Sequence, residues 1–176
     1  MQRRAWRLSW KSMADPDITQ LAAEAYLYGF PLVFDLDHVR RFLREGIGMV
    51  PAAPFNHFSH ARELAGPEDT FVTINNDTLY SIAQLDLSVG PIRLQVPDAH
   101  GRYYVLQFVD AWTNNFAYVG HRATGTAASE FLLVPCDWSG EAEANVRVIR
   151  VPTTVASIVG RWACGGVDDL SNVHAL

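Results

Sequence analysis

The sequence predicts a mainly β protein, with an antiparallel β-sandwich preceded by N-terminal helices. Three observations lead to this fold class. Apolar residues with helical spacing occur near the start of the chain, about eight short β-rich runs follow from Thr70, and no helical pattern alternates with those runs. Strands that follow one another without intervening helices favour an antiparallel sandwich over βαβ units. The 176 residues suffice for one domain with its own core.

Composition and charge exclude several classes of protein. With 49% hydrophobic and 19% charged residues, the chain is not disordered as a whole. The chain has a net charge of −5 and lacks the excess of basic residues that is typical of nucleic-acid-binding proteins, so no nucleic-acid partner is expected. No apolar run reaches the ~18 to 20 residues of a transmembrane segment. Cys136 and Cys164 are too few for a disulfide framework, and a bridge between them is not expected in a reducing cytoplasm.

Residues 1–14 are expected to form a disordered basic tail. Basic residues alternate there with Trp6 and Trp10. A secretory signal would continue into roughly 7 to 15 apolar residues, and this segment does not, so we expect a cytoplasmic protein. The alternative is that the mixture of tryptophan and arginine lies on an anionic membrane surface.

A helical region is predicted for residues 17–44. Asp15-Pro16-Asp17 is typical of a helix start, because it combines a capping carboxylate with proline in the first turn. Pro31, in Gly29-Phe30-Pro31, cannot donate a backbone hydrogen bond and should break the helix into segments 17–30 and 32–44. Apolar residues on one predicted face are Ile18, Leu21, Ala22, Ala25, Tyr28, Leu32, Leu36, Val39 and Leu43.

The rest of a single domain, residues 15–176, is predicted to be a long loop and a sandwich. Residues 45–69 are rich in glycine and proline and should form the loop. The sandwich should occupy 70–176, and alternation in Leu79–Leu87 predicts a strand with one buried face. The predicted strands are Phe71–Ile74, Leu79–Leu87, Ile92–Val96, Arg102–Val109, Phe116–Gly120, Phe131–Val134, Val146–Val151 and Val155–Trp162.

The first polar cluster, Asn75-Asn76-Asp77-Thr78, joins two predicted strands. Asp77 with Asn76 could bind a cation, accept a substrate hydroxyl or act as a general base. The alternative is that these side chains cap their own backbone in a turn.

The second polar cluster, Asp110 to Asn115, follows the most apolar strand. Trp112 could stack on a sugar or another planar group while Asp110 and Asn114 supply hydrogen bonds. An edge loop with a half-buried indole would explain the same residues. Arg122 could pair with Asp77, with Asp110 or with an anionic ligand.

No metal or cofactor site is predicted. His57 and His60 are three residues apart, a spacing that permits a metal pair, but no third ligand is evident. The sequence contains no phosphate loop, dinucleotide-binding fingerprint or nucleophile elbow.

Several segments resemble, in order, the bacterial family called domain of unknown function 1254. The resemblance extends from about Ala22 to Leu176. The matching segments are Ala25-Tyr26-Leu27-Tyr28-Gly29-Phe30-Pro31-Leu32-Val33, Asn76-Asp77-Thr78-Leu79-Tyr80-Ser81, Leu85-Asp86-Leu87-Ser88, Val96-Pro97-Asp98, Gly101-Arg102-Tyr103-Tyr104, Asp110-Ala111-Trp112-Thr113-Asn114-Asn115-Phe116-Ala117, Gly120-His121-Arg122-Ala123-Thr124-Gly125, Asp137-Trp138-Ser139-Gly140, Pro152-Thr153, Gly160-Arg161 and Asp168-Asp169-Leu170.

The resemblance implies an immunoglobulin-like sandwich preceded by helices, with no established catalytic residues. Many members also carry a domain of unknown function 1214, and the two-domain proteins look like oligomers. We therefore expect either a stand-alone chain or a truncated one, with a homo-oligomer or a separately encoded second domain as candidate partners. The characteristic polar positions of the family, our predicted ligand-binding residues, are Asn76, Asp77, Thr78, Tyr80, Asp110, Trp112, Asn114, Arg122 and Trp138.

Two hypotheses for function follow. The first is a polar and aromatic cleft that binds a small polar ligand, with a carbohydrate among the candidates and hydrolysis as an open extension. Asp77 and Asp110 would be its carboxylates, and their separation would decide any glycoside chemistry. The second is a non-enzymatic assembly module, in which the same residues fix loops and an exposed face pairs with another chain.

Overall fold

A computed structural model describes residues 17–69 and 74–176. The chain divides into two compact units, residues 1–30 and 31–176. The predicted tail at 1–14 and positions 71–73 of the first predicted strand lie outside the described residues. No helix in the described ranges is both long and apolar enough to cross a membrane.

The N-terminal helical region is one helix, α1 (Ile18–Glu45), which includes Pro31. The predicted break at Pro31 is therefore wrong. Proline removes one backbone donor from the ladder, but the hydrogen bonds of the neighbouring turns still maintain the helical conformation. Residues 31–45 belong to the larger unit, where Val39 and Phe42 are buried.

The rest of the larger unit is mainly β, as predicted, and most strand pairs are antiparallel. One sheet has the order β1-β2-β8-β4-β5 and the other β3-β6-β7, in which β6 and β7 pair in parallel. The strands are β1 (Phe58–His60), β2 (Thr78–Asp86), β3 (Ile92–Val96), β4 (Tyr104–Asp110), β5 (Asn115–Gly120), β6 (Ser129–Pro135), β7 (Arg147–Val151) and β8 (Val155–Ala163).

Seven of the predicted strands are confirmed within two residues at each end. The sequence did not predict β1, which lies inside the expected loop, or the C-terminal elements η2 (Val167–Asp169) and α2 (Leu170–His174). A short 3₁₀ turn, η1 (Leu87–Val89), follows β2.

The two sheets pack against each other across one core. Leu94 and Phe131 from the three-stranded sheet join Leu106, Phe108 and Ile158 from the five-stranded sheet in one cluster of buried side chains. A fully buried side chain of this size contributes about 1.5–3 kcal/mol, so this cluster is the main source of stability for the sheets.

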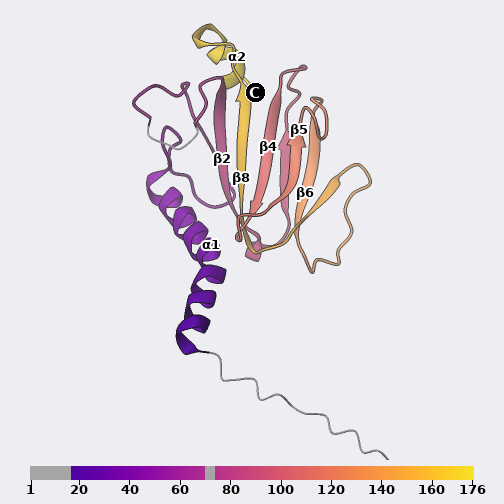
Figure 1. The fold of residues 1–176 in the computed structure, drawn as a ribbon. Helices are drawn as coiled ribbons and strands as arrows, with labels where there is room; N and C mark the ends of the chain where they lie inside the picture. The colour runs from indigo at the N-terminus through magenta and orange to yellow at the C-terminus, as the bar shows by residue number, and fades with distance from the viewer. Residues whose placement is uncertain (1–16, 70–73) are drawn as a thin grey trace, which may run out of the picture. The chain divides into compact units, whose positions relative to one another are not determined.

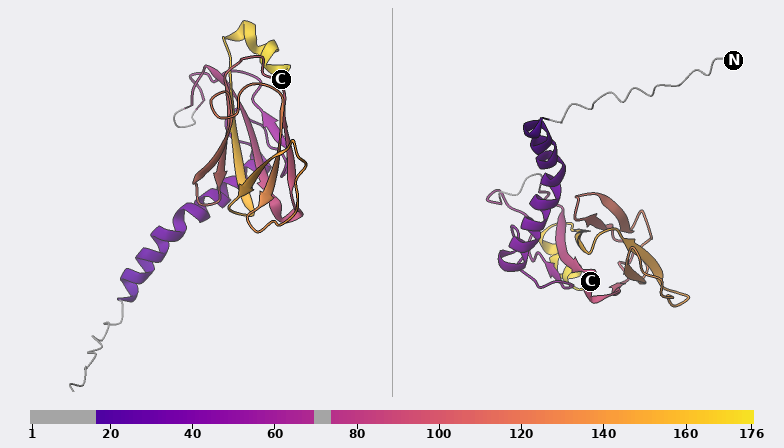
Figure 2. Two further views of the ribbon diagram at one scale, coloured as in Figure 1. Left: turned by 90° about the vertical axis from the view of Figure 1, so that its right-hand side faces the viewer. Right: turned by 90° about the horizontal axis from the view of Figure 1, so that it is seen from below.

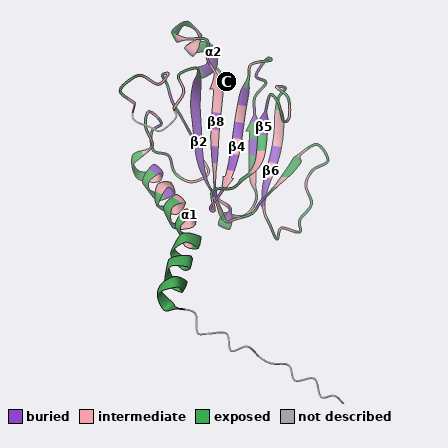
Figure 3. Cartoon of the chain, in the orientation of Figure 1, coloured by how far each residue is buried: buried purple, intermediate pink, exposed green. Residues whose placement is uncertain are grey.

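Strand β2 is buried on both faces, in contrast to the prediction of one buried face (Figure 3). Ala83 and Leu85 join the core between the sheets. Tyr80 and Ile82 point the other way and pack in a second cluster with Phe42 and Val50. Polar residues in this strand therefore do not mark a solvent-facing side.

The C-terminal helix α2 lies at the end of the five-stranded sheet where β2 begins and β8 ends (Figures 1 and 2). Its buried residue Val173 belongs to the second cluster, together with Leu79 and Cys164. This end of the molecule also holds the first of two cavities described below.

Candidate functional site

A cavity of about 370 Å³ lies between β1 and β3, and residues from both sheets and from α2 line it. Its apolar wall includes Leu79, Leu94, Val96 and Leu106, which also belong to the buried clusters. We call this cavity the inter-sheet pocket. Its polar lining residues are His60, Arg62, Ser81, Gln95, Trp162 and His174.

Ser81 is the polar centre of the inter-sheet pocket. Its Oγ lies 2.7 Å from Nδ1 of His60 and accepts a 3.0 Å hydrogen bond from the indole N–H of Trp162. An indole nitrogen only donates, so the Ser81 hydroxyl hydrogen remains available for Nδ1 of a neutral imidazole. The register of the sheet creates this contact, because β1 places His60 opposite Ser81.

The environment of His60 disfavours the charged form of its imidazole. Burial lowers the pKa of its imidazole from the usual 6.5, and the positive charge of Arg62 lowers this pKa further. A neutral ring suits the hydrogen bond to Ser81, since an imidazolium would be donor-only at both nitrogens.

Two aromatic contacts fix the shape of this pocket. Trp162 stacks on Tyr104, with ring centroids 4.6 Å apart and planes at 9°. The His60 ring stacks on Phe58 at 5.9 Å. Stacking restricts the rotation of both rings, so the indole has a fixed orientation in the pocket wall.

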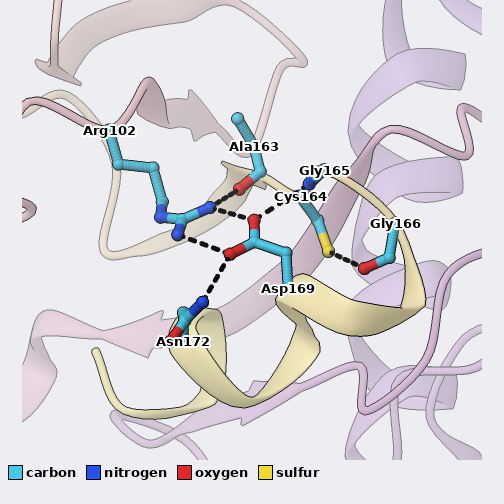
Figure 4. A network of polar contacts seen from close by, with 7 residues as sticks. All are labelled: Arg102, Ala163, Cys164, Gly165, Gly166, Asp169 and Asn172. Atoms are coloured by element: carbon cyan, nitrogen blue, oxygen red, sulfur yellow. Dashed lines mark hydrogen bonds and ion pairs between the residues drawn. The ribbon is translucent and has the colours of Figure 1, made fainter.

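A polar network attaches the α2 side of the pocket to the sheet (Figure 4). Arg102 donates to both carboxylate oxygens of Asp169, at 2.5 and 2.9 Å, and to the carbonyl of Ala163 at 2.7 Å. Asp169 also accepts from the Gly165 N–H and from Asn172. These hydrogen bonds hold the pKa of Asp169 well below its usual value, and the bond from Arg102 has the largest effect.

The structure does not bring the predicted ligand-binding residues together. Strands β2 and β4 both pair antiparallel with β8 and therefore run in the same direction. Thr78, at the start of β2, is opposite Ala163, whereas Asp110, at the end of β4, is opposite Ala156. Seven residues of β8 separate these positions, about 23 Å at the usual rise of a strand. The two predicted carboxylates thus lie at opposite ends of the sheet, too far apart to flank one glycosidic bond.

Near the start of β2, the predicted residues form a turn. Thr78 donates to the Asn75 side chain at 2.6 Å, and the Asp77 carbonyl accepts from the Cys164 N–H. Tyr80 accepts from the Asn75 N–H through its hydroxyl. Asn76 and Asp77 are exposed. These contacts fix the segment before β2, and Tyr80 is the one predicted residue that also lines the inter-sheet pocket.

At the end of β4, Asp110 caps a tight turn. Its carboxylate accepts from the backbone N–H groups of Trp112 and Asn114, each at 2.9 Å, and from the Asn114 side chain at 3.2 Å. Asp110 itself is buried, while Trp112 is half-buried.

Arg122 and Trp138 lie elsewhere. The Arg122 guanidinium lies over the Tyr103 ring, 5.4 Å from its centroid, rather than beside either predicted carboxylate. Trp138 follows β6, and its carbonyl accepts from Arg150.

Within residues 17–69 and 74–176, no group of three His, Cys, Asp or Glu side chains could hold a metal ion. Nδ1 of His57 contacts the Phe55 carbonyl, and His60 contacts Ser81. Cys136 is exposed and Cys164 is buried, and both are free thiols in the structure.

Ser81, Trp162 and the role of His60 were not predicted from the sequence. Ser81 interrupts an apolar strand and was a visible signal, since a hydroxyl in such a strand requires a partner. Its partners lie 21 and 81 positions away along the chain, so only the strand pairing reveals them.

Solved structures similar to this chain include two bacterial proteins. The VPA0106 protein from Vibrio parahaemolyticus is 28% identical, with a TM-score of 0.68 over 90% of this chain. The chain spans about a third of that protein, 36% of its length. A protein from Burkholderia cenocepacia is 15% identical, with a TM-score of 0.43, over 90% of this chain and 41% of that one. No curated protein matches the chain.

A family model matches residues 55–176, which include every strand and both polar clusters. This match covers more than half of the sequence and includes the resembling segments from Asn76 onward. The chain therefore belongs to the family described as "Protein of unknown function (DUF1254)".

Proposed function

We propose that this protein binds a small carboxylate with an apolar body in the inter-sheet pocket. One observation carries the proposal: the lining of the pocket includes the Arg62 guanidinium, a charged hydrogen-bond donor, and no aspartate or glutamate side chain lines it. A pocket that offers donors and a fixed positive charge favours an anionic ligand with hydrogen-bond acceptors.

The apolar wall defines the other end of the ligand. Leu94, Val96 and Leu106 provide an apolar surface next to the Trp162 indole. Ligand pockets commonly combine such a wall with a few polar groups that fix orientation. A ring or short chain attached to one carboxylate satisfies both ends, whereas a carbohydrate would require acceptors for its many hydroxyls.

The experiment is a calorimetric and thermal-shift comparison of benzoate, hexanoate, benzyl alcohol and glucose. A carboxylate at 100 times its Kd should stabilise the protein by about 2.7 kcal/mol, which is about 5–10 °C in a domain of this size. Arg62→Gln should remove most of the binding, while Arg41→Gln, on the exposed surface of α1, should leave it unchanged. Stabilisation by glucose alone, or equal carboxylate binding by Arg62→Gln, would refute the proposal.

Ester hydrolysis is the second candidate, and the 2.7 Å contact between Ser81 and His60 favours it. In such a reaction the Ser81 oxygen would attack the ester carbonyl while His60 accepts the hydroxyl proton. The alcohol would then leave with that proton, and water would hydrolyse the acyl-Ser81 to release the acid and restore the serine. The test is release of p-nitrophenol from p-nitrophenyl acetate by the wild-type protein. Release that Ser81→Ala leaves unchanged would reject this candidate without affecting the binding proposal.

A further inference from the structure

A second cavity, of about 210 Å³, lies on the opposite face of β2 and β8 from the inter-sheet pocket. Residues 35–50 cover it and the outward side chains of the two strands form its floor. We call it the helix-sheet pocket. Its apolar lining includes Val39, Phe42, Val50, Ile82 and Val159, several of them buried.

Most polar residues around the helix-sheet pocket already have partners. Arg161 lies over the Tyr80 ring at 5.4 Å and donates to Gln107 at 3.1 Å. Gln84 accepts from Ser157 at 2.5 Å. The His38 ring packs on Phe34, with centroids 4.4 Å apart. These groups are therefore poorly placed to bind a charged ligand without losing an existing contact.

Asp35 differs from these residues. Its half-buried side chain lines the pocket, and among the described residues no hydrogen bond or ion pair to its carboxylate is found. Burial raises the pKa of Asp35, the nearby Asp110 charge raises it further, and His38 opposes them. The Asp110 carboxylate itself accepts three hydrogen bonds from donors in its own turn. An added cation would thus relieve an unfavourable charge at Asp35.

We propose that the helix-sheet pocket binds a small organic cation, a primary ammonium on a short hydrocarbon, with the ammonium on the Asp35 carboxylate and the hydrocarbon against Val39, Phe42 and Ile82. The assignment rests on the Asp35 carboxylate, unpaired among the described residues, and on the apolar lining; the Arg161 guanidinium, which also lines the pocket, lies over the Tyr80 ring. It is independent of the ligand proposed for the inter-sheet pocket.

The test is isothermal titration at pH 7.5 with cyclohexylammonium, cyclohexanol and cyclohexanecarboxylate as probes. The ammonium should bind at least tenfold more tightly than the alcohol, and the carboxylate should not compete with it. Asp35→Asn should weaken ammonium binding at least tenfold. The matched control is Asp37→Asn, two residues later on the same helix and exposed, which should bind like the wild-type protein.

Three results would overturn the proposal. These are no ammonium binding by the wild-type protein at millimolar concentration, equal binding by Asp35→Asn, and alcohol binding as tight as that of the ammonium. Thermal melting of each variant shows whether it is folded, and the comparison of ammonium with alcohol in the wild-type protein requires no variant.

Discussion

Replacing Asp110 with alanine tests whether this residue is a structural cap. In the structure, its buried carboxylate holds the turn after β4 through two backbone N–H groups and one side-chain amide. Asp110→Ala removes all three acceptor contacts. The backbone bond from the Thr113 N–H to the Asp110 carbonyl remains, so the turn should loosen without changing its path.

The expected loss follows from these contacts. A hydrogen bond to a charged group contributes about 1.5–3 kcal/mol, so the three contacts set an upper limit of about 9 kcal/mol. Asn114 is exposed and Trp112 half-buried, so water can replace part of what is lost. We therefore expect Asp110→Ala to lower the free energy of unfolding by about 2–3 kcal/mol and the melting temperature by about 5–10 °C. Asp110→Asn keeps one acceptor oxygen and should lose less than half as much.

Urea denaturation and thermal melting measure these changes. The control is Asp98→Ala, in which an exposed carboxylate accepts one backbone bond, from the His100 N–H at 2.8 Å, and little stability should be lost. Carboxylate binding in the inter-sheet pocket should persist, since Asp110 lies at the other end of the sheet. An Asp110→Ala protein that melts like the wild type but binds no carboxylate would show that the residue is functional rather than structural.

Two further predictions concern protonation and backbone space. Because the folded pKa of His60 is below its unfolded value of 6.5, the unfolded state takes up the proton first, and stability should fall as pH drops below about 6.5. Between pH 7.5 and 5.5, the free energy of unfolding measured by urea titration should fall less for His60→Gln than for the wild-type protein. An equal fall in both proteins would contradict the lowered pKa of His60. Gly120 has φ +147°, and a Cβ there would approach the Tyr104 carbonyl, so Gly120→Ala should lose at least about 3 kcal/mol or fail to fold. Gly125 has φ +89° and open space around a new methyl group, so Gly125→Ala should lower the free energy of unfolding by only about 1–2 kcal/mol. Equal losses in the two variants would show that the clash with the Tyr104 carbonyl is not what destabilises Gly120→Ala.

Local pattern predicted most of the strands, because turn residues separate short β-rich runs such as Ile92–Val96. It did not predict β1 and α2, which are too short for a periodic pattern to develop. The double burial of β2 was also missed, since alternation does not report that a second cluster covers the other face.

The order of strands explains why the candidate site was predicted only in part. Asp77 precedes one apolar strand and Asp110 ends another, so the sequence suggested that both line one cleft. In the sheet, however, β8 lies between β2 and β4, and these two strands run in the same direction. The contact between Ser81, His60 and Trp162 depends on pairing across three strands, which spacing along the chain does not encode. Tyr80 was found because its segment matches the family.

The double burial of β2 places the two pockets back to back. Ser81 faces the inter-sheet pocket and its neighbour Ile82 the helix-sheet pocket, while Tyr80 lines both. On β8, Trp162 lines the inter-sheet pocket and its neighbour Arg161 lines the helix-sheet pocket. A single layer of backbone thus separates two cavities, and a ligand that shifts β2 on one side changes the other cavity as well. Where one ligand changes the affinity of the other, thermodynamic linkage requires the reverse effect to have the same factor.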